Sequence, residues 1–396
     1  LIAKVSATDV NLIRLVVRII RERYTQYTAE LAQQKDSSKV TLPRYQELTS
    51  LVTHRHNFGT EWLESVTKAL TYCLNEMPVE AKISIDEAVD IACRINSNSH
   101  GLESDSGDFG LGLFPTVPLF NHACSPNVFF YPAVQGHGAL RISVIAPIAQ
   151  NEEMCVSYID QYMSREERQK ILKETKFFDC ACKRCSEAWT TTAIDSLVEG
   201  FVCHLTPGCK GLIVPKSFGN WSCTECDGAV QEVKVLERYK EILMLMSKAN
   251  YAASTKKYHD VKDIVGSIMS QFATPGKGST MLQLNPHHYI VFKCNYLLMN
   301  ATTSNKDYLG VIRYAKALIS NYKMVTPSYH MELANVYAHL VYAYDSALSS
   351  GKGGKSTNEY KTHREEALKK AIEIKKVCLG ETHHEVSVLT QKLTKK

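Results

Sequence analysis

The chain has 396 residues, which at about 150 residues per domain predicts two or three domains, a length that can bury a core without disulfide bonds. It is 44% hydrophobic and 22% charged, fractions that exclude a fibrous, collagen-like or wholly disordered protein. The 46 basic and 41 acidic residues leave a net charge of +5, which by itself does not indicate nucleic-acid binding.

The first quarter of the chain is predicted to be helical. Residues 9–34 carry apolar side chains at helical spacing, with arginines on the opposite side. Residues 44–98 repeat this pattern, with one apolar face from Trp62 to Cys73 and another from Ile85 to Ala92. The most apolar stretch, Leu12–Ile20, contains two arginines and is too short to span a bilayer, so no membrane segment is predicted here.

A different pattern begins at residue 99. Residues 101–112 are rich in Gly, Ser and Asp, which predicts a loop. Short apolar, β-branched and aromatic runs separated by turn residues then predict a compact β domain. These runs are Leu113–Phe120, Val128–Tyr131, Ala139–Ala146 and Met154–Ile159. Residues 164–176 return to helical periodicity.

Residues 232–394 show long helical periodicities. The clearest predicted helices are Tyr289–Met299, Tyr308–Tyr322, Tyr329–Ala347 and His363–Val377, with a loop over 300–306. Paired helices of this length favour a TPR-like array. No clean 34-residue repeat is present, so generic helical packing is an equally good interpretation.

The cysteines are concentrated: seven of the thirteen fall within 47 residues. The odd total argues against complete disulfide pairing, and the C-x-C and C-x-x-C spacings indicate zinc in a reducing compartment. One set has the spacing of a zinc ribbon with glycines around its turns: Cys203, Cys209, Cys223 and Cys226. The other set, Cys180, Cys182 and Cys185, needs a fourth ligand, and Cys124 is the leading candidate.

Three motifs follow one another in a specific order. They are NHACSPN at 121–127, VSYID at 156–160 and FFDCACKRC at 177–185. Together they resemble the second half of a SET domain followed by its cysteine-rich post-SET tail. The helical insert at 44–98, the approach GLGLFPTVPLFNH and the helical C-terminal region are similar to the SET and MYND domain (SMYD) family, particularly to members with an extra zinc ribbon.

The resemblance implies an S-adenosylmethionine-dependent protein-lysine N-methyltransferase. Tyr158 matches the catalytic tyrosine of the family. The residues that match cofactor contacts are His54, Asn98, Asn121, His122 and Phe178. The resemblance also makes Cys124 the fourth ligand of the post-SET zinc, so that two structural zinc ions are expected.

The chemistry of lysine methylation is compatible with these residue types. A lysine amine, with an ordinary pKa of about 10.4, must lose its proton before it can attack a methyl group. A narrow apolar channel lowers that pKa, and alignment supplies much of the remaining catalysis. A phenol oxygen such as that of Tyr158 can orient the amine and accept weak contacts from the methyl group.

The chain departs from the family pattern at three places. Lys176 stands where relatives commonly have an aromatic residue beside the lysine channel, and Ala123 replaces a common serine. The family's N-terminal G-x-G strands and MYND module are absent from this chain, since Gly110-Leu111-Gly112 is not in the corresponding position. The resemblance therefore puts one wall of the cofactor pocket before residue 1.

We expect an α+β fold with a partial SET β-fold, a helical insert, a cysteine-rich zinc-binding post-SET region and a TPR-like α-helical C-terminal domain. The predicted divisions are a helical segment with SET insert, the C-terminal half of the SET core, post-SET with zinc ribbon, and the helical domain. Their ranges are 1–98, 99–163, 164–231 and 232–396.

The expected substrate is a protein that presents a lysine side chain, and histone and non-histone lysines are equally open. We also expect a protein partner on the helical C-terminal domain, no membrane contact and no direct nucleic-acid binding. The expected location is intracellular, in the cytoplasm, the nucleus or both. The competing interpretation is a non-catalytic scaffold derived from a SET protein, whose zinc modules and helices bind other proteins.

Overall fold

The structure is a computed structural model, and it describes most of the chain. The described residues are 7–31, 45–103, 109–132, 140–217, 219–226, 228–273, 281–350 and 357–394. The chain separates into two compact units, one of residues 1–121 with 132–141 and one of residues 122–131 with 142–396. The domain boundaries predicted from the sequence stay predictions.

Four helices form most of the first unit. They are α1 (Ala7–Leu31), α2 (Tyr45–Thr49), α3 (Thr60–Asn75) and α4 (Ile85–Asn98). Helix α4 begins where the Ser84 side chain accepts a hydrogen bond from the Glu87 backbone N–H at 3.1 Å, a Ser-x-x-Glu cap. Apolar residues of α1, α3 and α4, among them Val16 and Leu70, form one buried cluster. The helical prediction for this region is confirmed.

A β-hairpin follows α4, where the composition predicted a loop. Strands β1 (His100–Glu103) and β2 (Phe109–Gly112) pair antiparallel, and His100 lies opposite Gly112. The loop prediction for 101–112 is therefore wrong at both ends, while residues 104–108 lie outside the described residues. Because β2 packs against α1, tertiary contact and cross-strand hydrogen bonds outweigh the low strand propensity of the glycines.

Two of the four predicted β runs form strands. These are β3 (Val128–Pro132) and β4 (Leu140–Val144), which pair with each other. Within the described part of residues 113–120 a single turn of 3-10 helix, Val117–Leu119, replaces the expected strand, in keeping with its proline. Residues 154–159 contribute one isolated parallel bridge, between Val156 and His122, rather than a strand.

The cysteine-rich region contains short helices and a small sheet. Its helices are α5 (Arg165–Lys176), α6 (Lys183–Ser186) and α7 (Ile194–Glu199). The antiparallel sheet has the order β8-β7-β6-β5-β9, with β5 (Phe201–Val202), β6 (Leu212–Ser217), β7 (Asn220–Cys223), β8 (Ala229–Gln231) and β9 (Gln283–Leu284). Phe201 lies opposite both Ile213 and Leu284, so the last strand ties the helical region to this sheet.

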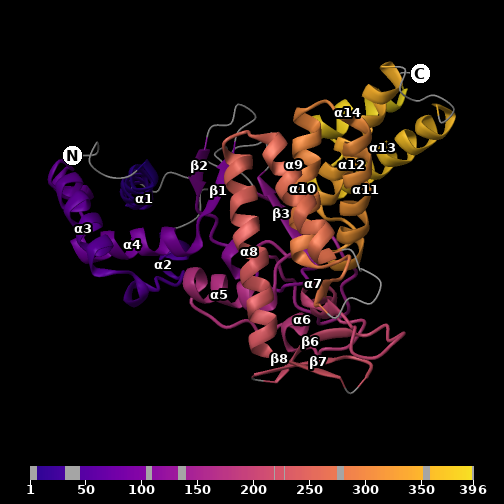
Figure 1. The fold of residues 1–396 in the computed structure, drawn as a ribbon. Coiled ribbons are helices and arrows are strands. Elements are labelled where there is room, and N and C mark those ends of the chain that lie inside the picture. Colours follow the sequence, from indigo (N-terminus) through magenta and orange to yellow (C-terminus); the bar gives the residue numbers. More distant parts are fainter. Residues whose placement is uncertain are drawn as a thin grey trace. The chain divides into compact units, whose positions relative to one another are not determined.

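The rest of the chain is an array of helices that pack side by side (Figure 1). They are α8 (Glu232–Ser254), α9 (Tyr258–Ile268) with a π-helical turn at Met269–Ala273, α10 (Tyr289–Ser304), α11 (Tyr308–Val325), α12 (Met331–Ser349), α13 (Thr357–Leu379) and α14 (His384–Thr394). The predicted helical C-terminal region is confirmed. The loop predicted over 300–306 is wrong for most of its length because buried Thr302 bonds to the Leu298 carbonyl within α10. Among the described helices, none combines the length and apolar character needed to cross a bilayer.

Candidate active site and metal centres

Four cysteines from two parts of the chain meet in one buried cluster, which we call the Cys124 centre. Its members are Cys124, Cys180, Cys182 and Cys185, and their sulfur atoms all lie within 4.8 Å of one another. Cys124 precedes β3, whereas the other three occupy the loop after α5 and the short helix α6. Four thiolates at this spacing match the ligand set of a closed structural zinc site.

Hydrogen bonding within the Cys124 centre favours a negative charge on one sulfur, that of Cys182. Hydrogen bonds to Cys182 and Cys185 raise the pKa of the Cys124 thiol, and burial raises the pKa of the Cys180 thiol. The thiols of Cys124 and Cys185 donate toward Cys182, and this lowers the pKa of the Cys182 thiol. The Cys124 backbone N–H also donates to the Cys182 sulfur at 3.4 Å. Because the thiolate is the form that binds zinc, this arrangement suits a metal ligand set.

A second set of four cysteines forms the predicted ribbon, which we call the ribbon centre. Its members are Cys203, Cys209, Cys223 and Cys226, whose sulfur atoms also lie within 4.8 Å of one another. Backbone N–H groups of Gly211 and Glu225 donate to the sulfurs of Cys209 and Cys223, each at 3.4 Å. A Cβ atom on Gly211 would lie 2.5 Å from the Cys223 sulfur, so this turn needs glycine.

The two ends of helix α5 determine how the chain enters the Cys124 centre. Ser164 caps the helix by accepting a hydrogen bond from the Glu167 N–H at 3.1 Å. Phe177 ends the helix in the left-handed region, with φ of 63°, an uncommon conformation for a bulky residue. The chain then turns, and Phe178 and the first cysteine of the tail follow directly.

His122 links the Cys124 centre to Tyr158. Its Nδ1 accepts a hydrogen bond from the Tyr158 backbone N–H at 3.0 Å, while its Nε2 lies 3.3 Å from the Cys124 sulfur. Burial lowers the pKa of His122 to about 4, so the ring is neutral near pH 7. A neutral ring that accepts at Nδ1 carries its proton on Nε2, which then donates to sulfur.

Three aromatic rings gather at this point. The rings of His122 and Tyr158 have centroids 5.3 Å apart, and Phe178 lies 6.2 Å from His122. Burial raises the pKa of the half-buried Tyr158, so its phenol keeps its proton at neutral pH. Lys176 places its Nζ 5.6 Å from the centre of the Tyr158 ring, and burial lowers the pKa of this lysine.

Asn127, at the end of the NHACSPN motif, holds this loop in place. Its side-chain oxygen accepts from the Cys155 N–H at 2.8 Å, and its amide donates to the Glu153 carbonyl at 2.8 Å. The motif is thereby joined to the segment that leads to Tyr158. Asn127 is buried, and the sequence pattern alone does not indicate this role.

The remaining predicted cofactor residues belong to the first unit. The Asn98 side chain donates to the Val52 carbonyl at 2.9 Å, and Ser97 donates to the Thr53 carbonyl at 3.1 Å. These bonds hold the end of α4 beside the segment that carries His54, whose φ is 49°. Asn121, the last residue of this unit before the NHACSPN motif continues, is exposed.

Comparison with known proteins gives a consistent result. Residues 13–159 match the family model of the SET domain. Human N-lysine methyltransferase SMYD2 is 24% identical over 311 residues, which cover 78% of this chain and 60% of the relative. The chain is therefore similar to SMYD-type SET proteins.

Two further relatives extend the match. N-lysine methyltransferase SMYD2-A of Danio rerio is 24% identical over 375 residues, covering 94% of this chain and 73% of the relative. Histone-lysine N-methyltransferase ASHR1 of Arabidopsis thaliana is 22% identical over 326 residues, covering 80% and 63%. The chain spans about 60% of the length of SMYD2 from several vertebrates.

Sequence reasoning missed the charged residues that surround the Cys124 centre. Arg168 and Arg184 are almost completely buried, and both contact the carboxylate of Asp195 at 2.8 Å. In the sequence these arginines look like members of solvated helix faces, because charged residues are rarely buried. The sequence signals only Arg184, which lies within the cysteine motif, and gives no signal for Arg168 in the middle of α5.

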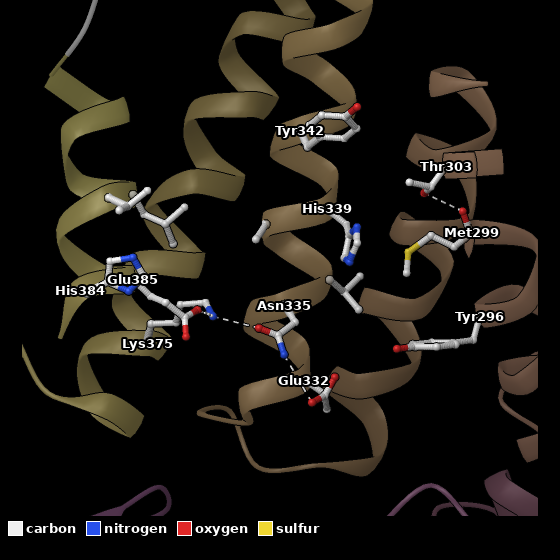
Figure 2. Close-up of a pocket in the computed structure, with 14 residues that line it drawn as sticks. Tyr296, Met299, Thr303, Glu332, Asn335, His339, Tyr342, Lys375, His384 and Glu385 are labelled. Atoms are coloured by element: carbon white, nitrogen blue, oxygen red, sulfur yellow. Dashed lines mark hydrogen bonds and ion pairs between the residues drawn. The ribbon is translucent and has the colours of Figure 1, made fainter. Parts of the chain in front are cut away.

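The helical array has a pocket of its own, of about 570 Å³, lined by α10, α12, α13 and α14 (Figure 2). Buried Lys375 donates to the side-chain oxygen of Asn335 at 2.9 Å and to Glu385 at 2.5 Å. Tyr296 and Tyr342 line the opposite part of the pocket. The lysine is therefore already paired within the array.

Proposed function

We propose that this protein is an S-adenosylmethionine-dependent protein-lysine N-methyltransferase. The observation that carries the proposal is the Tyr158 site: a half-buried, protonated tyrosine whose backbone is bonded to His122 of the NHACSPN motif. Both residues lie in the stretch that matches the SET domain. The names of the relatives, which are lysine methyltransferases, support the same activity.

The residues present suit the proposed cofactor. Phe178 offers a half-buried aromatic face near the His122 ring, which fits the flat adenine group of S-adenosylmethionine. We propose that Asn121, His122 and Phe178 contact this cofactor. The family resemblance also assigns cofactor contacts to His54 and Asn98. When bound, the cofactor would supply an electrophilic methyl group to a neutral lysine amine.

Tyr158 is the proposed catalytic residue. Because burial raises its pKa, its hydroxyl stays neutral and can serve as a hydrogen-bonding group rather than as a base. The hydrogen bond from its backbone N–H to His122 fixes its position, and alignment of this kind is worth a large part of the barrier to a transfer reaction. The partly apolar surroundings disfavour an ammonium ion and so help a substrate lysine to lose its proton.

The two cysteine centres are proposed to hold one structural zinc ion each. The ligands would be Cys124, Cys180, Cys182 and Cys185 in one, and Cys203, Cys209, Cys223 and Cys226 in the other. Zinc in the Cys124 centre would fasten the tail that carries Phe178 to the loop that carries His122. Structural zinc contributes directly to folding, so this centre would support the shape of the active site.

The proposed substrate is a lysine side chain on another protein, histone or non-histone. A further protein partner on the helical C-terminal domain stays a prediction. The pocket in Figure 2 carries the paired charges of Lys375 and Glu385 together with the Glu332 carboxylate, which accepts a hydrogen bond from Asn335.

Methyl transfer from labelled S-adenosylmethionine to a proteome extract tests the proposal. The protein that contains this chain should label lysine side chains, which mass spectrometry then maps. Calorimetry should detect binding of S-adenosylmethionine in the absence of substrate. Failure of both cofactor binding and lysine labelling would overturn the proposal and favour the non-catalytic scaffold.

A further inference from the structure

Arg168 is buried against the sulfur atoms of the Cys124 centre. Its side chain is 0% exposed, its Nε donates to the Cys124 sulfur at 3.2 Å, and one terminal nitrogen lies 3.7 Å from the Cys185 sulfur. The other terminal nitrogen donates to the Met163 carbonyl at 2.8 Å. One guanidinium group thus faces two of the four cysteines.

Asp195, on α7, holds this arginine in place. Its carboxylate accepts hydrogen bonds from Arg168, Arg184 and Arg165, each at 2.8 Å. Arg184 also donates to the Cys124 carbonyl at 3.2 Å, so it fixes the backbone of the same cysteine. The helices α5, α6 and α7 are therefore joined around one buried carboxylate.

The charges of this group do not balance without the sulfurs. Three guanidinium groups share the Asp195 carboxylate, and two of the three are almost completely buried. The other acid nearby is buried Glu199, which accepts from the Arg165 backbone N–H and whose pKa burial raises to about 7, so it is only partly charged at neutral pH. A buried positive charge without an anionic partner is costly. Besides Asp195, Arg168 contacts the sulfurs of Cys124 and Cys185. Neutral thiols would not compensate its positive charge, whereas a zinc ion with four thiolates carries two negative charges.

The ribbon centre lacks this feature. In the described residues, the contacts to its sulfurs come from backbone N–H groups, from other cysteines and from the Thr206 hydroxyl, none of them charged donors. Lys216 bonds to the Cys223 carbonyl at 3.0 Å and not to its sulfur. An arginine is therefore not a general requirement of a four-cysteine cluster in this protein.

We propose that Arg168, anchored by Asp195, is a positioning residue of the Cys124 centre that offsets the charge of its thiolates. This proposal rests on the zinc binding in the proposed function. It adds that zinc binding at the Cys124 centre depends on the positive charge of Arg168. Because the Cys124 sulfur contacts His122, and His122 holds Tyr158, Arg168 also acts on the position of the catalytic tyrosine. Partners in the outer sphere of a metal affect affinity by 10- to 100-fold in other proteins.

Chelator competition on the full chain tests this proposal. Arg168→Met should bind one of its two zinc ions about 10- to 100-fold more weakly than the unchanged protein, while the other zinc keeps its affinity. Arg168→Lys keeps the positive charge but loses the forked guanidinium group. Its zinc affinity should lie between those of Arg168→Met and the unchanged protein. The matched control is Arg238→Met, since Arg238 is also buried but bonds to the carbonyls of Leu282 and Gln271 rather than to a sulfur.

Cobalt substitution supplies a readout that general destabilisation would not move. Loss of an N–H donor to sulfur should shift the sulfur-to-cobalt charge-transfer band of Arg168→Met to longer wavelength, with no shift in Arg238→Met. Equal zinc affinity and equal spectra in Arg168→Met and the unchanged protein would overturn the role of Arg168. If Arg168→Met does not fold, the affinity and band position of Arg168→Lys decide in the same way, and no zinc in the unchanged protein would instead overturn the zinc proposal.

Discussion

The two cysteine centres have the same four side-chain types but different surroundings. The Cys124 centre joins residues 56 positions apart in the chain, is mostly buried, and lies against Arg168 and His122. The ribbon centre is formed within 24 residues, two of its cysteines are partly exposed, and backbone N–H groups surround it. The two centres therefore have the same four cysteine side chains but differ in burial and in the residues around them.

The different surroundings indicate which part of the structure each centre affects. The ribbon centre closes a local turn, so its consequences stay with the sheet of β5 to β9. The Cys124 centre connects a loop to a distant tail and touches the residue that holds Tyr158. We therefore expect changes around Cys124 to affect catalysis and changes in the ribbon to affect mainly stability.

The largest expected effect follows from removal of the Tyr158 hydroxyl. Tyr158→Phe should lower the rate of methyl transfer by about 10²-fold or more, because the group that aligns the amine is lost. Both zinc ions should remain. Single-turnover transfer of labelled methyl to a mapped lysine measures the effect.

The control for this change is Tyr162→Phe. Tyr162 is buried four residues further on, and its hydroxyl donates to the His287 carbonyl at 2.8 Å. Its loss should cost about 1 kcal/mol or somewhat more in the free energy of unfolding and leave the rate within about threefold. Equal rate losses in the two variants would remove Tyr158 from its catalytic role.

A methyl group in the ribbon should separate stability from catalysis. Gly211→Ala would place a Cβ 2.5 Å from the Cys223 sulfur and 2.9 Å from the Glu225 side chain. We expect a loss of about 1–3 kcal/mol in the stability of this region and weaker binding of one zinc ion, with little change in methyl transfer. Thermal unfolding and zinc analysis check both.

The matched control for Gly211 is Gly266, inside helix α9. A Cβ there meets no atom within 4 Å, so Gly266→Ala should be neutral or stabilising by up to about 1 kcal/mol. A Gly211→Ala protein with unchanged zinc and unfolding temperature would mean that the ribbon tolerates a wider turn than its geometry indicates.

The smallest effect concerns Lys176, beside Tyr158. A positive charge 5.6 Å from the Tyr158 ring opposes the approach of a substrate ammonium ion. Lys176→Phe, which restores the residue type common in the family, should lower KM for a lysine substrate by about threefold, equivalent to about 0.6 kcal/mol. Peptide kinetics measure this, and an increase in KM would show that Lys176 attracts substrate instead.

The pH dependence gives a related check. Burial lowers the pKa of Lys176, so this side chain loses its charge at a lower pH than an ordinary lysine. Its repulsion of substrate should therefore fade as pH rises toward the ordinary lysine pKa. The KM advantage of Lys176→Phe should shrink along the same pH series, and a constant advantage would exclude a charge effect.

Periodicity was a good guide wherever a helix buries a regular apolar face. The sequence predicted a helix over 164–176, and α5 covers Arg165–Lys176 with the Ser164 cap. The helices of the C-terminal region are likewise confirmed, although α10 continues through the predicted loop at 300–306. The apolar residues at helical spacing form the faces that these helices bury, and this burial stabilises the helices.

Composition was a poor guide where tertiary contact decides. The Gly-rich segment around 101–112 forms two strands because they pair with each other and pack on α1. The residues that surround the Cys124 centre were missed for a similar reason. Arg168 and Asp195 are buried only because the fold brings opposite charges together. The spacing of these residues along the chain does not predict that they pair.

The cysteine motifs stand between these cases. Short spacings such as C-x-x-C limit where sulfurs can point, so both sets could be grouped from the sequence, and the structure brings each set within 4.8 Å. The distant member, Cys124, came from a resemblance rather than from spacing. The roles assigned to His54, Asn98, Asn121, His122, Tyr158 and Phe178 stay proposals.

The most direct test measures zinc content and methyl transfer together in Cys124→Ser and Cys226→Ser. Each variant removes one proposed ligand from one centre, so we expect about one zinc ion per chain in each variant and two in the unchanged protein. We expect Cys226→Ser to keep most of its methyl transfer and Cys124→Ser to lose it, because the Cys124 sulfur contacts His122. Equal methyl-transfer rates in the two variants would contradict the unequal roles of the two centres.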